Sequence, residues 1–263
     1  MNVEVDGRLA HASTGAVDPT GEAVVLVHGA GMDHTAWQQQ TRWLAHRGLA
    51  AVAVDLPGHG ASEGPPRPTI GAIADWLDRF VTSAGLAPAH FVGHSMGSLA
   101  ALELAARRPE VVLSLVLMGT AGSMPVHPDL LAAARAGDAL AVDLICAWGH
   151  GVTAHAGGHP APGMWMIGGG QALLMRTLGE AMATDLQACA DYDGAPTAAA
   201  EVTCPVTIIA GTADRMTPAA AARPLADACG AELVELPDVG HMMMIEAPQA
   251  VRGALLAALQ RRG

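Results

Sequence analysis

Short runs of almost uninterrupted apolar residues recur along the chain, separated by stretches with an apolar residue every three or four positions. Six runs end in turn-forming residues, at 23–29, 49–60, 90–95, 113–119, 206–211 and 231–237. Runs of this kind predict parallel strands buried on both faces. The spaced apolar positions predict four helices, at 35–48, 70–85, 97–109 and 248–262. Strands alternating with helices predict an α/β fold with a mostly parallel central sheet flanked by helices on both faces.

This alternation stops between residues 122 and 200. The stretch has no strand-like run, and two helix-like pieces flank a segment rich in Gly, Pro and His at 149–170. We therefore expect residues 122–200 to form a helical cap inserted over the sheet. Residues 1–121 and 201–263 together would form the core domain.

Composition and charge limit the function classes. With 263 residues, 51% of them hydrophobic, the chain can bury a large core. The net charge is −11, and the chain has no Lys/Arg cluster to neutralise phosphates or to bind an anionic lipid surface. We expect neither a nucleic acid nor a membrane as a partner. The sequence does not indicate an oligomeric state.

The cysteines and the N-terminus favour a cytoplasmic protein without a cofactor. The four cysteines are scattered, without metal-ligand spacing, as is typical of reduced thiols in the cytosol. No signal peptide is visible, and no apolar run approaches the about 18 residues that a membrane span needs. The histidines lack the helix spacing of a metal site, and no Gly-rich turn matches a nucleotide-binding pattern, so we expect no metal and no cofactor.

The segment 91–100, "FVGHSMGSLA", places a serine at a strand-to-helix junction with a glycine two residues away on each side. Ligands of parallel α/β sheets bind beyond the carboxyl ends of the strands, so Ser95 would be exposed at the ligand edge. Gly93 and Gly97 would let the helix approach the strand closely. This arrangement is the nucleophile elbow, and we identify Ser95 as the candidate nucleophile.

A serine nucleophile needs a general base and an acid that orients the base. Two later strand ends provide them: Asp214 follows the strand at 206–211, and His241 follows the strand at 231–237. The order Ser95, Asp214, His241 is the order known for this type of site. Asp238 lies closer to His241 in sequence, but its context is more typical of a turn.

Hydrolysis also requires two N–H donors for the developing oxyanion. One is expected from Met96, the residue after the nucleophile. The other is expected from the loop after the first strand, "HGAG" at 28–31, with Ala30 as the first choice and Gly31 as the second.

Together these motifs resemble the α/β-hydrolase fold superfamily, in its serine-nucleophile, esterase-like branch. The resemblance covers residues 22–121 and 201–262. It rests on "VHGAG", "DLPGHGAS", "GHSMGS", "GTADRMTP" and "VGHMMMIEAP". It implies transfer of an acyl group to Ser95, followed by hydrolysis, without a cofactor. The same triad serves C–C bond hydrolases, lactonases, thioesterases and perhydrolases, and a non-catalytic receptor for small ligands is a further alternative.

The substrate pocket is expected beneath the 122–200 insertion. The candidate lining residues are Gly31, Thr120, Trp148, Met164, Trp165, Met216 and Met242. Thirteen methionines and few aromatics favour a pliable apolar cavity. We expect no cationic residue beside Ser95, Asp214 or His241, and we therefore expect a neutral, small-to-medium acyl substrate.

Overall fold

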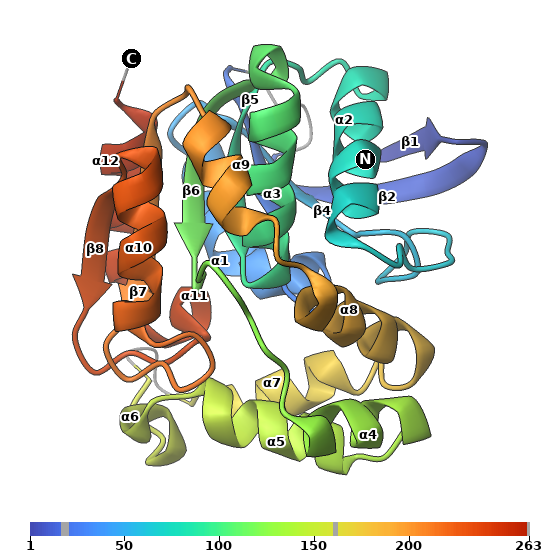
Figure 1. Ribbon diagram of the computed structural model, residues 1–263, viewed down its shortest axis with the longest axis vertical. Coiled ribbons are helices and arrows are strands. Elements are labelled where there is room, and N and C mark those ends of the chain that lie inside the picture. The colour runs from blue at the N-terminus through green and yellow to red at the C-terminus, as the bar shows by residue number, and fades with distance from the viewer. Residues whose placement is uncertain (17–20, 160–162, 262–263) are drawn as a thin grey trace.

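The computed structural model describes residues 1–16, 21–159 and 163–261 of the chain (Figure 1). Its strands form one eight-stranded sheet in the order β1-β2-β4-β3-β5-β6-β7-β8. This confirms the predicted α/β class with a mostly parallel sheet. The end of the last predicted helix and residues 160–162 of the expected insertion lie outside the described residues.

Six strands form the parallel part of the sheet, and each overlaps one of the predicted runs. They are β3 (Ala23–Val27), β4 (Ala50–Val54), β5 (Ala89–His94), β6 (Val112–Met118), β7 (Val206–Gly211) and β8 (Glu232–Leu236). Every residue of β3, β4, β5 and β7 is buried. Burial on both faces explains why these sequences are mostly apolar and do not alternate regularly with polar residues.

An antiparallel hairpin at the N-terminus was not predicted. Strands β1 (Asn2–Val5) and β2 (Arg8–Thr14) pair with each other through a tight turn at Asp6 and Gly7, and β2 pairs antiparallel with β4. Both strands carry exposed polar residues. A half-exposed edge hairpin of this kind has no long apolar run to identify it.

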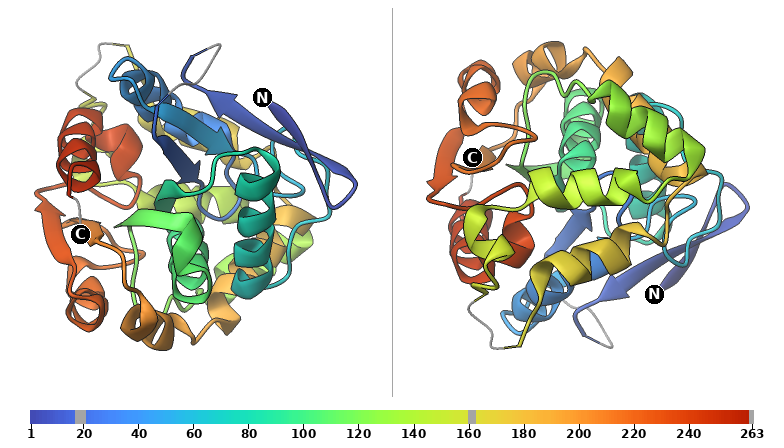
Figure 2. Two further views of the ribbon diagram at one scale, coloured as in Figure 1. Left: turned by 90° about the horizontal axis from the view of Figure 1, so that it is seen from above. Right: turned by 90° about the horizontal axis from the view of Figure 1, so that it is seen from below.

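Helices cover both faces of the sheet, which follows from the alternation of side chains along the strands. In β3, Val25 and Val27 face one core layer, and Val24 and Leu26 face the other. The first layer contains α2 (Ile70–Ser83), α3 (Met96–Arg107), α9 (Ala195–Glu201) and α10 (Ala219–Cys229). The second contains the 3-10 turn at His34–Trp37, α1 (Gln38–Ala45), α11 (Met243–Glu246) and α12 (Pro248–Leu259) (Figure 2, left).

Five helices lie beyond the carboxyl ends of the strands. They are α4 (Pro128–Ala136), α5 (Leu140–Gly149), α6 (Val152–His155), α7 (Met166–Leu174) and α8 (Glu180–Asp191). In Figure 1 the arrowheads of β6 and β8 point towards them, and Figure 2 (right) shows them spread across this end of the molecule. We call α4–α8 the cap helices. Helix α9, which also precedes residue 201, packs instead with α3 and α10 in the first core layer.

The described residues contain no helix whose length and apolar character would suit a membrane span.

Candidate active site

Ser95 lies at the junction between β5 and α3 in a backbone conformation that is rare for a residue with a side chain. Its φ is 52° and its ψ is −119°. The Ser95 N–H donates to the Met118 carbonyl of the neighbouring strand, and the Ser95 carbonyl accepts from the N–H of Ser98 in the first turn of α3. The backbone is therefore held on both sides while the side chain extends from the apex of the turn.

Gly93 and Gly97, two residues from Ser95 on either side, lie where the backbone of α3 comes very close to β5 and to the end of β3. A Cβ on Gly93 would collide with the Gly97 carbonyl, and a Cβ on Gly97 would lie 2.5 Å from the Val27 oxygen and 2.6 Å from the His28 oxygen. Any side chain at these positions would push α3 away from β3 and β5. Close packing of the helix on the sheet thus requires glycine at both positions.

Asp214 and His241 come together from the loops after β7 and β8. The Nδ1 of His241 is 2.8 Å from Asp214 Oδ2, and both side chains are buried. Thr217 adds its hydroxyl to the same oxygen at 2.7 Å, and the N–H groups of Met216 and Thr217 donate to Oδ1 at 2.8 Å. Because an ionised carboxylate only accepts hydrogen bonds, His241 carries its proton on Nδ1 and leaves Nε2 as an acceptor. By contrast, Asp238 is exposed with a φ of 60°, as suits a turn residue.

These contacts set the charge of Asp214. Burial alone would raise the pKa of the carboxyl group. The charge and hydrogen bond of His241, together with the donors of Thr217, outweigh burial and hold the pKa of Asp214 below its ordinary value. Asp214 is therefore ionised at neutral pH beside the imidazole.

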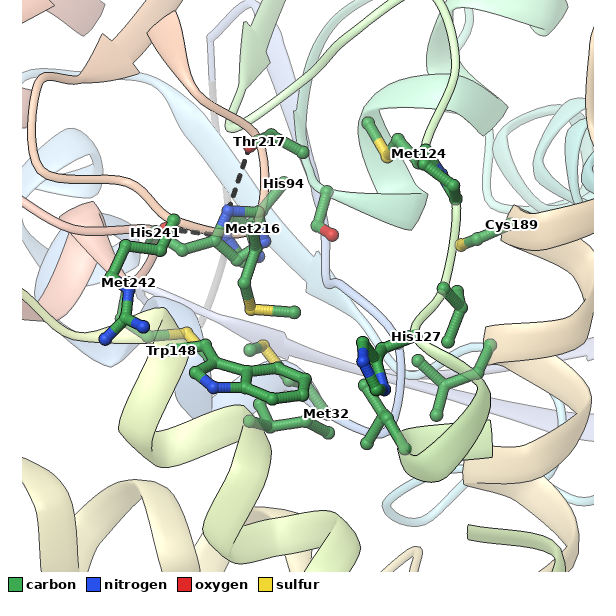
Figure 3. Close-up of a pocket in the computed structure, with 18 residues that line it drawn as sticks. Met32, His94, Met124, His127, Trp148, Cys189, Met216, Thr217, His241 and Met242 are labelled. Carbon is green, nitrogen blue, oxygen red and sulfur yellow. Dashed lines mark hydrogen bonds between the residues drawn. The ribbon is translucent and has the colours of Figure 1, made fainter. Parts of the chain in front are cut away.

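His94, next to Ser95 in sequence, packs against the ring of His241 and is hydrogen-bonded to its backbone. Its ring lies 4.7 Å from the ring of His241, and its Nε2 donates to the His241 carbonyl at 2.9 Å. Burial, with the nearby His241, lowers the pKa of His94 to about 3. A neutral His94 fixes the backbone of His241 without placing a second cation beside it (Figure 3).

The backbone N–H groups of Ala30 and Met96 lie near Ser95 and have no acceptor among the described residues. The Met96 side chain is buried in the core, so only its N–H group is relevant here. Ala30 lines the same cavity as Ser95. Unpaired donors of this kind are suited to an anionic oxygen.

A cavity of about 290 Å³ brings these groups together. Ala30, Ser95, His94, Thr217 and His241 form one wall. The cap helices and the segment before α4 contribute much of the rest. The remaining lining residues are Met32, Met124, Pro125, Val126, His127, Leu130, Ile145, Trp148, Leu186, Cys189, Arg215, Met216 and Met242 (Figure 3).

Comparison with known proteins identifies the family. The model of the alpha/beta hydrolase family matches residues 24–254. The chain belongs to the alpha/beta hydrolase family. The resemblance inferred from the sequence motifs is thereby confirmed.

Several relatives of this α/β hydrolase are known. The chain is 40% identical over 102 residues to a pimeloyl-[acyl-carrier protein] methyl ester esterase of Methylococcus capsulatus, covering 37% of each chain. It is 30% identical to a dihydrolipoyllysine-residue acetyltransferase component of the acetoin cleaving system of Pseudomonas putida, over 92% of this chain and 64% of that protein. The matches to the first curated relatives span only about a third of their length, 31% and 37%.

A solved structure extends the similarity to the whole fold. The enol-lactonase from Burkholderia xenovorans LB400 superposes with a TM-score of 0.88 at 26% identity, over 99% of this chain and all of that one.

Of the seven candidate pocket residues of this α/β hydrolase, three line the cavity: Trp148, Met216 and Met242. The other four do not. Thr120 is buried beside the cavity without lining it, and the N–H of Gly31 is bonded to Asp185. Met164 and Trp165 line a different hollow, between α7 and the start of α1, and Trp165 is 67% exposed. Their positions next to a Gly-rich segment did not reveal which side of α7 they occupy.

The expectation of a pocket without a cation was wrong. Arg215 directly follows Asp214 in the sequence and lines the cavity. It is exposed, and its side chain has no hydrogen-bond or ion-pair partner in the described part of the chain. The position of Arg215 next to Asp214 is the sequence signal that indicates this cation.

Other missed lining residues come from the cap. Leu186 and Cys189 are three residues apart on α8, which places them on one face of that helix. The ring of His127, at the start of α4, lies 5.5 Å from that of Trp148 on α5. The sequence alone does not show which faces of these helices turn towards Ser95.

Among the residues that the structure describes, one side-chain group could hold a metal ion: His11, His34 and Asp55, whose ligand atoms lie within 4.8 Å of one another. It is assembled from three separate segments, so no sequence spacing reveals it. However, Asp55 already accepts bonds from His34 and from the N–H of Ala61, and His11 Nδ1 is bonded to Asn2. These bonds account for the cluster as a brace of the loop after β4.

Proposed function

We propose that this protein is a serine hydrolase that cleaves carboxylic esters of small-to-medium acyl groups through an acyl-enzyme. One observation carries the proposal. Ser95, held at a positive φ, lines the same cavity as His241, whose Nδ1 is bonded to the buried Asp214.

In the first half-reaction, Nε2 of His241 takes the proton of Ser95 Oγ, and the oxygen attacks the ester carbonyl carbon. The carbonyl oxygen becomes an oxyanion, which accepts hydrogen bonds from the N–H groups of Ala30 and Met96. The carbonyl re-forms, the bond to the alcohol oxygen breaks, and His241 returns the proton to the leaving alcohol. The acyl group remains on Ser95.

In the second half-reaction, water takes the place of the alcohol. His241 accepts a proton from water as the water attacks the acyl carbon, and the same N–H groups stabilise the second oxyanion. The bond to Ser95 Oγ then breaks, and His241 gives the proton back to the serine. Asp214 holds the imidazole in the required tautomer and stabilises its protonated form.

The cavity supports the size and polarity of the substrate. At about 290 Å³ it lies at the small end of ligand pockets, which typically have about 300–1,000 Å³. Methionine and aliphatic side chains dominate the lining, and we assign the cap helices α4–α8 the role of shaping the acyl site. Arg215 adds a cation to an otherwise mainly neutral lining.

The first test is hydrolysis of p-nitrophenyl esters of increasing acyl length by the wild type and by Ser95→Ala. We expect turnover of short and medium chains by the wild type, with a loss of activity by about 10⁴-fold or more in Ser95→Ala at unchanged melting temperature. Similar activity in both proteins would overturn the assignment of Ser95. A folded wild type that hydrolyses no ester would overturn ester hydrolysis.

A lactone is a second candidate substrate, because the structurally similar enol-lactonase of Burkholderia xenovorans shares 26% identity over nearly the whole chain. The chemistry is the same, except that the alcohol stays attached to the acyl group after ring opening. Adding a simple aliphatic lactone to the panel, with acid release measured by pH-stat, separates the two substrate classes.

A further inference from the structure

A carboxylate from the cap reaches the loop that carries Ala30. Asp185 on α8 is 1% exposed, although it belongs to a helix on the outside of the molecule. Its Oδ2 accepts the N–H of Gly31 at 2.9 Å and is 2.9 Å from Nε2 of His59. Asp185 thus joins the cap to two core loops that are 154 and 126 residues away in sequence.

His59 is a cation in this arrangement. Its Nδ1 is 3.1 Å from the Pro57 carbonyl, and its Nε2 faces Asp185. Both partners can only accept hydrogen bonds, so both ring nitrogens carry a proton. Burial alone would lower the pKa of His59, but the charge and hydrogen bond of Asp185 outweigh it and raise the pKa. The imidazolium therefore neutralises a carboxylate that would otherwise repel a nearby oxyanion.

A second cap residue holds the other side of Gly31. The hydroxyl of Thr177, in the turn between α7 and α8, donates to the Gly31 carbonyl. Gly31 has a φ of 69°, and a Cβ there would lie 3.0 Å from Met182 and 3.3 Å from the Thr177 hydroxyl. Both polar groups of the Gly31 backbone are therefore bonded to cap side chains.

The bonds from Asp185 and Thr177 to Gly31 affect Ala30 through the Ala30 Cα, which joins the two neighbouring peptide planes. The Gly31 N–H lies in the peptide plane that follows Ala30, and Asp185 fixes that plane. The preceding plane contains the Ala30 N–H and the Gly29 carbonyl. That carbonyl accepts from Met32 N–H at 3.2 Å and from Nδ1 of His28 at 2.9 Å, while His28 Nε2 accepts from Leu56 N–H. His28 and the Met32 N–H orient one plane, and the cap orients the next.

We propose that Asp185 is a positioning residue, which with Thr177 holds the Ala30 N–H in place from the cap and so couples the seating of the cap to transition-state stabilisation. This inference rests on the proposed ester hydrolysis. Loss of this positioning should lower kcat and leave KM nearly unchanged, because the oxyanion exists only in the transition state and the tetrahedral intermediate.

The test compares Asp185→Ala, Asp185→Asn and Thr177→Val with Tyr192→Phe as the matched control. Tyr192 directly follows α8, and its hydroxyl donates to Glu103 of α3 at 2.6 Å. Tyr192→Phe therefore removes a hydrogen bond between the same segment and the core without touching the Ala30 loop. kcat and KM are measured on p-nitrophenyl butyrate, and exchange of the Gly31 amide proton is followed by NMR.

We expect Asp185→Ala to lower kcat by about 10- to 100-fold with little change in KM, since small misplacements of catalytic groups have costs of this size. Asp185→Asn keeps an acceptor for Gly31 and should recover most of kcat. Thr177→Val should give a smaller loss. Exchange of the Gly31 amide should accelerate by about tenfold in Asp185→Ala and remain unchanged in Tyr192→Phe.

A folded Asp185→Ala with wild-type kcat would overturn the inference, and so would an equal loss in Tyr192→Phe. If Asp185→Ala does not fold, wild-type kcat and unchanged Gly31 amide exchange in Thr177→Val would also overturn it. A wild type without esterase activity contradicts the proposed function instead, and the amide exchange then still tests the grip on Gly31.

Discussion

Asp214–His241 and Asp185–His59 are two buried carboxylate–histidine pairs with almost the same separation, 2.8 Å and 2.9 Å. Only His241 lines the cavity. The pairs differ in the other nitrogen of the histidine: within the described residues, Nε2 of His241 has no hydrogen-bond partner, whereas Nδ1 of His59 faces the Pro57 carbonyl. A carboxylate partner therefore does not by itself make a histidine a base. The base needs a ring nitrogen that is left free to accept a proton.

The pairs also differ in how they are built. Asp214 receives its other hydrogen bonds from Met216 and Thr217 in its own loop. Asp185 is bonded to residues more than a hundred positions away. The first pair is a local structure at the end of a strand, and the second exists only when the cap is seated on the core.

The same substitution in both histidines gives the largest contrast. His241→Gln removes the proposed base and should lower kcat by about 10⁴-fold or more. His59→Gln keeps a donor for Asp185 and should lower kcat by less than about tenfold, because it affects only the support of the Ala30 loop. Steady-state kinetics on p-nitrophenyl butyrate measures both. Equal losses in the two variants would show that His59 takes part in proton transfer.

Arg215 places a positive charge on the side of the cavity where Asp214 lies. As an exposed, unpaired cation it should favour substrates whose acyl chain ends in a carboxylate. Arg215→Gln should lower kcat/KM for mono-p-nitrophenyl glutarate relative to p-nitrophenyl butyrate by about 2- to 5-fold, the size expected for an exposed ion pair. Arg42→Gln on α1, an exposed arginine that does not line the cavity, is the control. An unchanged ratio in Arg215→Gln would show that the guanidinium does not contact the acyl chain.

The pH dependence of stability should have opposite signs for the two pairs. The pKa of Asp214 is lowered by folding, so its contribution to stability is present above its unfolded pKa of about 3.9 and is lost as the pH falls through the folded value. The pKa of His59 is raised, so its contribution is complete below about pH 6.5 and is lost as the pH rises through the folded value.

Melting temperatures of the wild type, Asp214→Asn and His59→Gln between pH 3 and pH 9 test this. The gap between the wild type and Asp214→Asn should shrink at the acidic end. The gap between the wild type and His59→Gln should shrink at the alkaline end. We expect changes on the order of 2 °C for a chain of this size. Gaps that do not vary with pH would contradict the assigned charge states.

The contrast between the pairs also explains what could be predicted from sequence. Ser95, Asp214 and His241 each follow a strand of the parallel part of the sheet, so the sheet pattern brings them to one edge. Asp185 lies on a cap helix whose docking depends on tertiary packing, and nothing in its local sequence indicates that it is buried. The same reason applies to Met164 and Trp165, which were expected to face Ser95 but lie on another side of α7. The N-terminal hairpin was not predicted because its strands are short and half-exposed and contain no long apolar run.

The backbone of Ser95 has a consequence for how this chain evolves. A φ of 52° at a residue with a side chain stores strain of about 1–3 kcal/mol. Glycine would adopt the same turn without that strain, so a drift towards greater stability at this position would remove the proposed nucleophile. Selection for stability alone cannot maintain a serine there. The residue proposed to react with the substrate is thus the one that stability of the fold alone would replace.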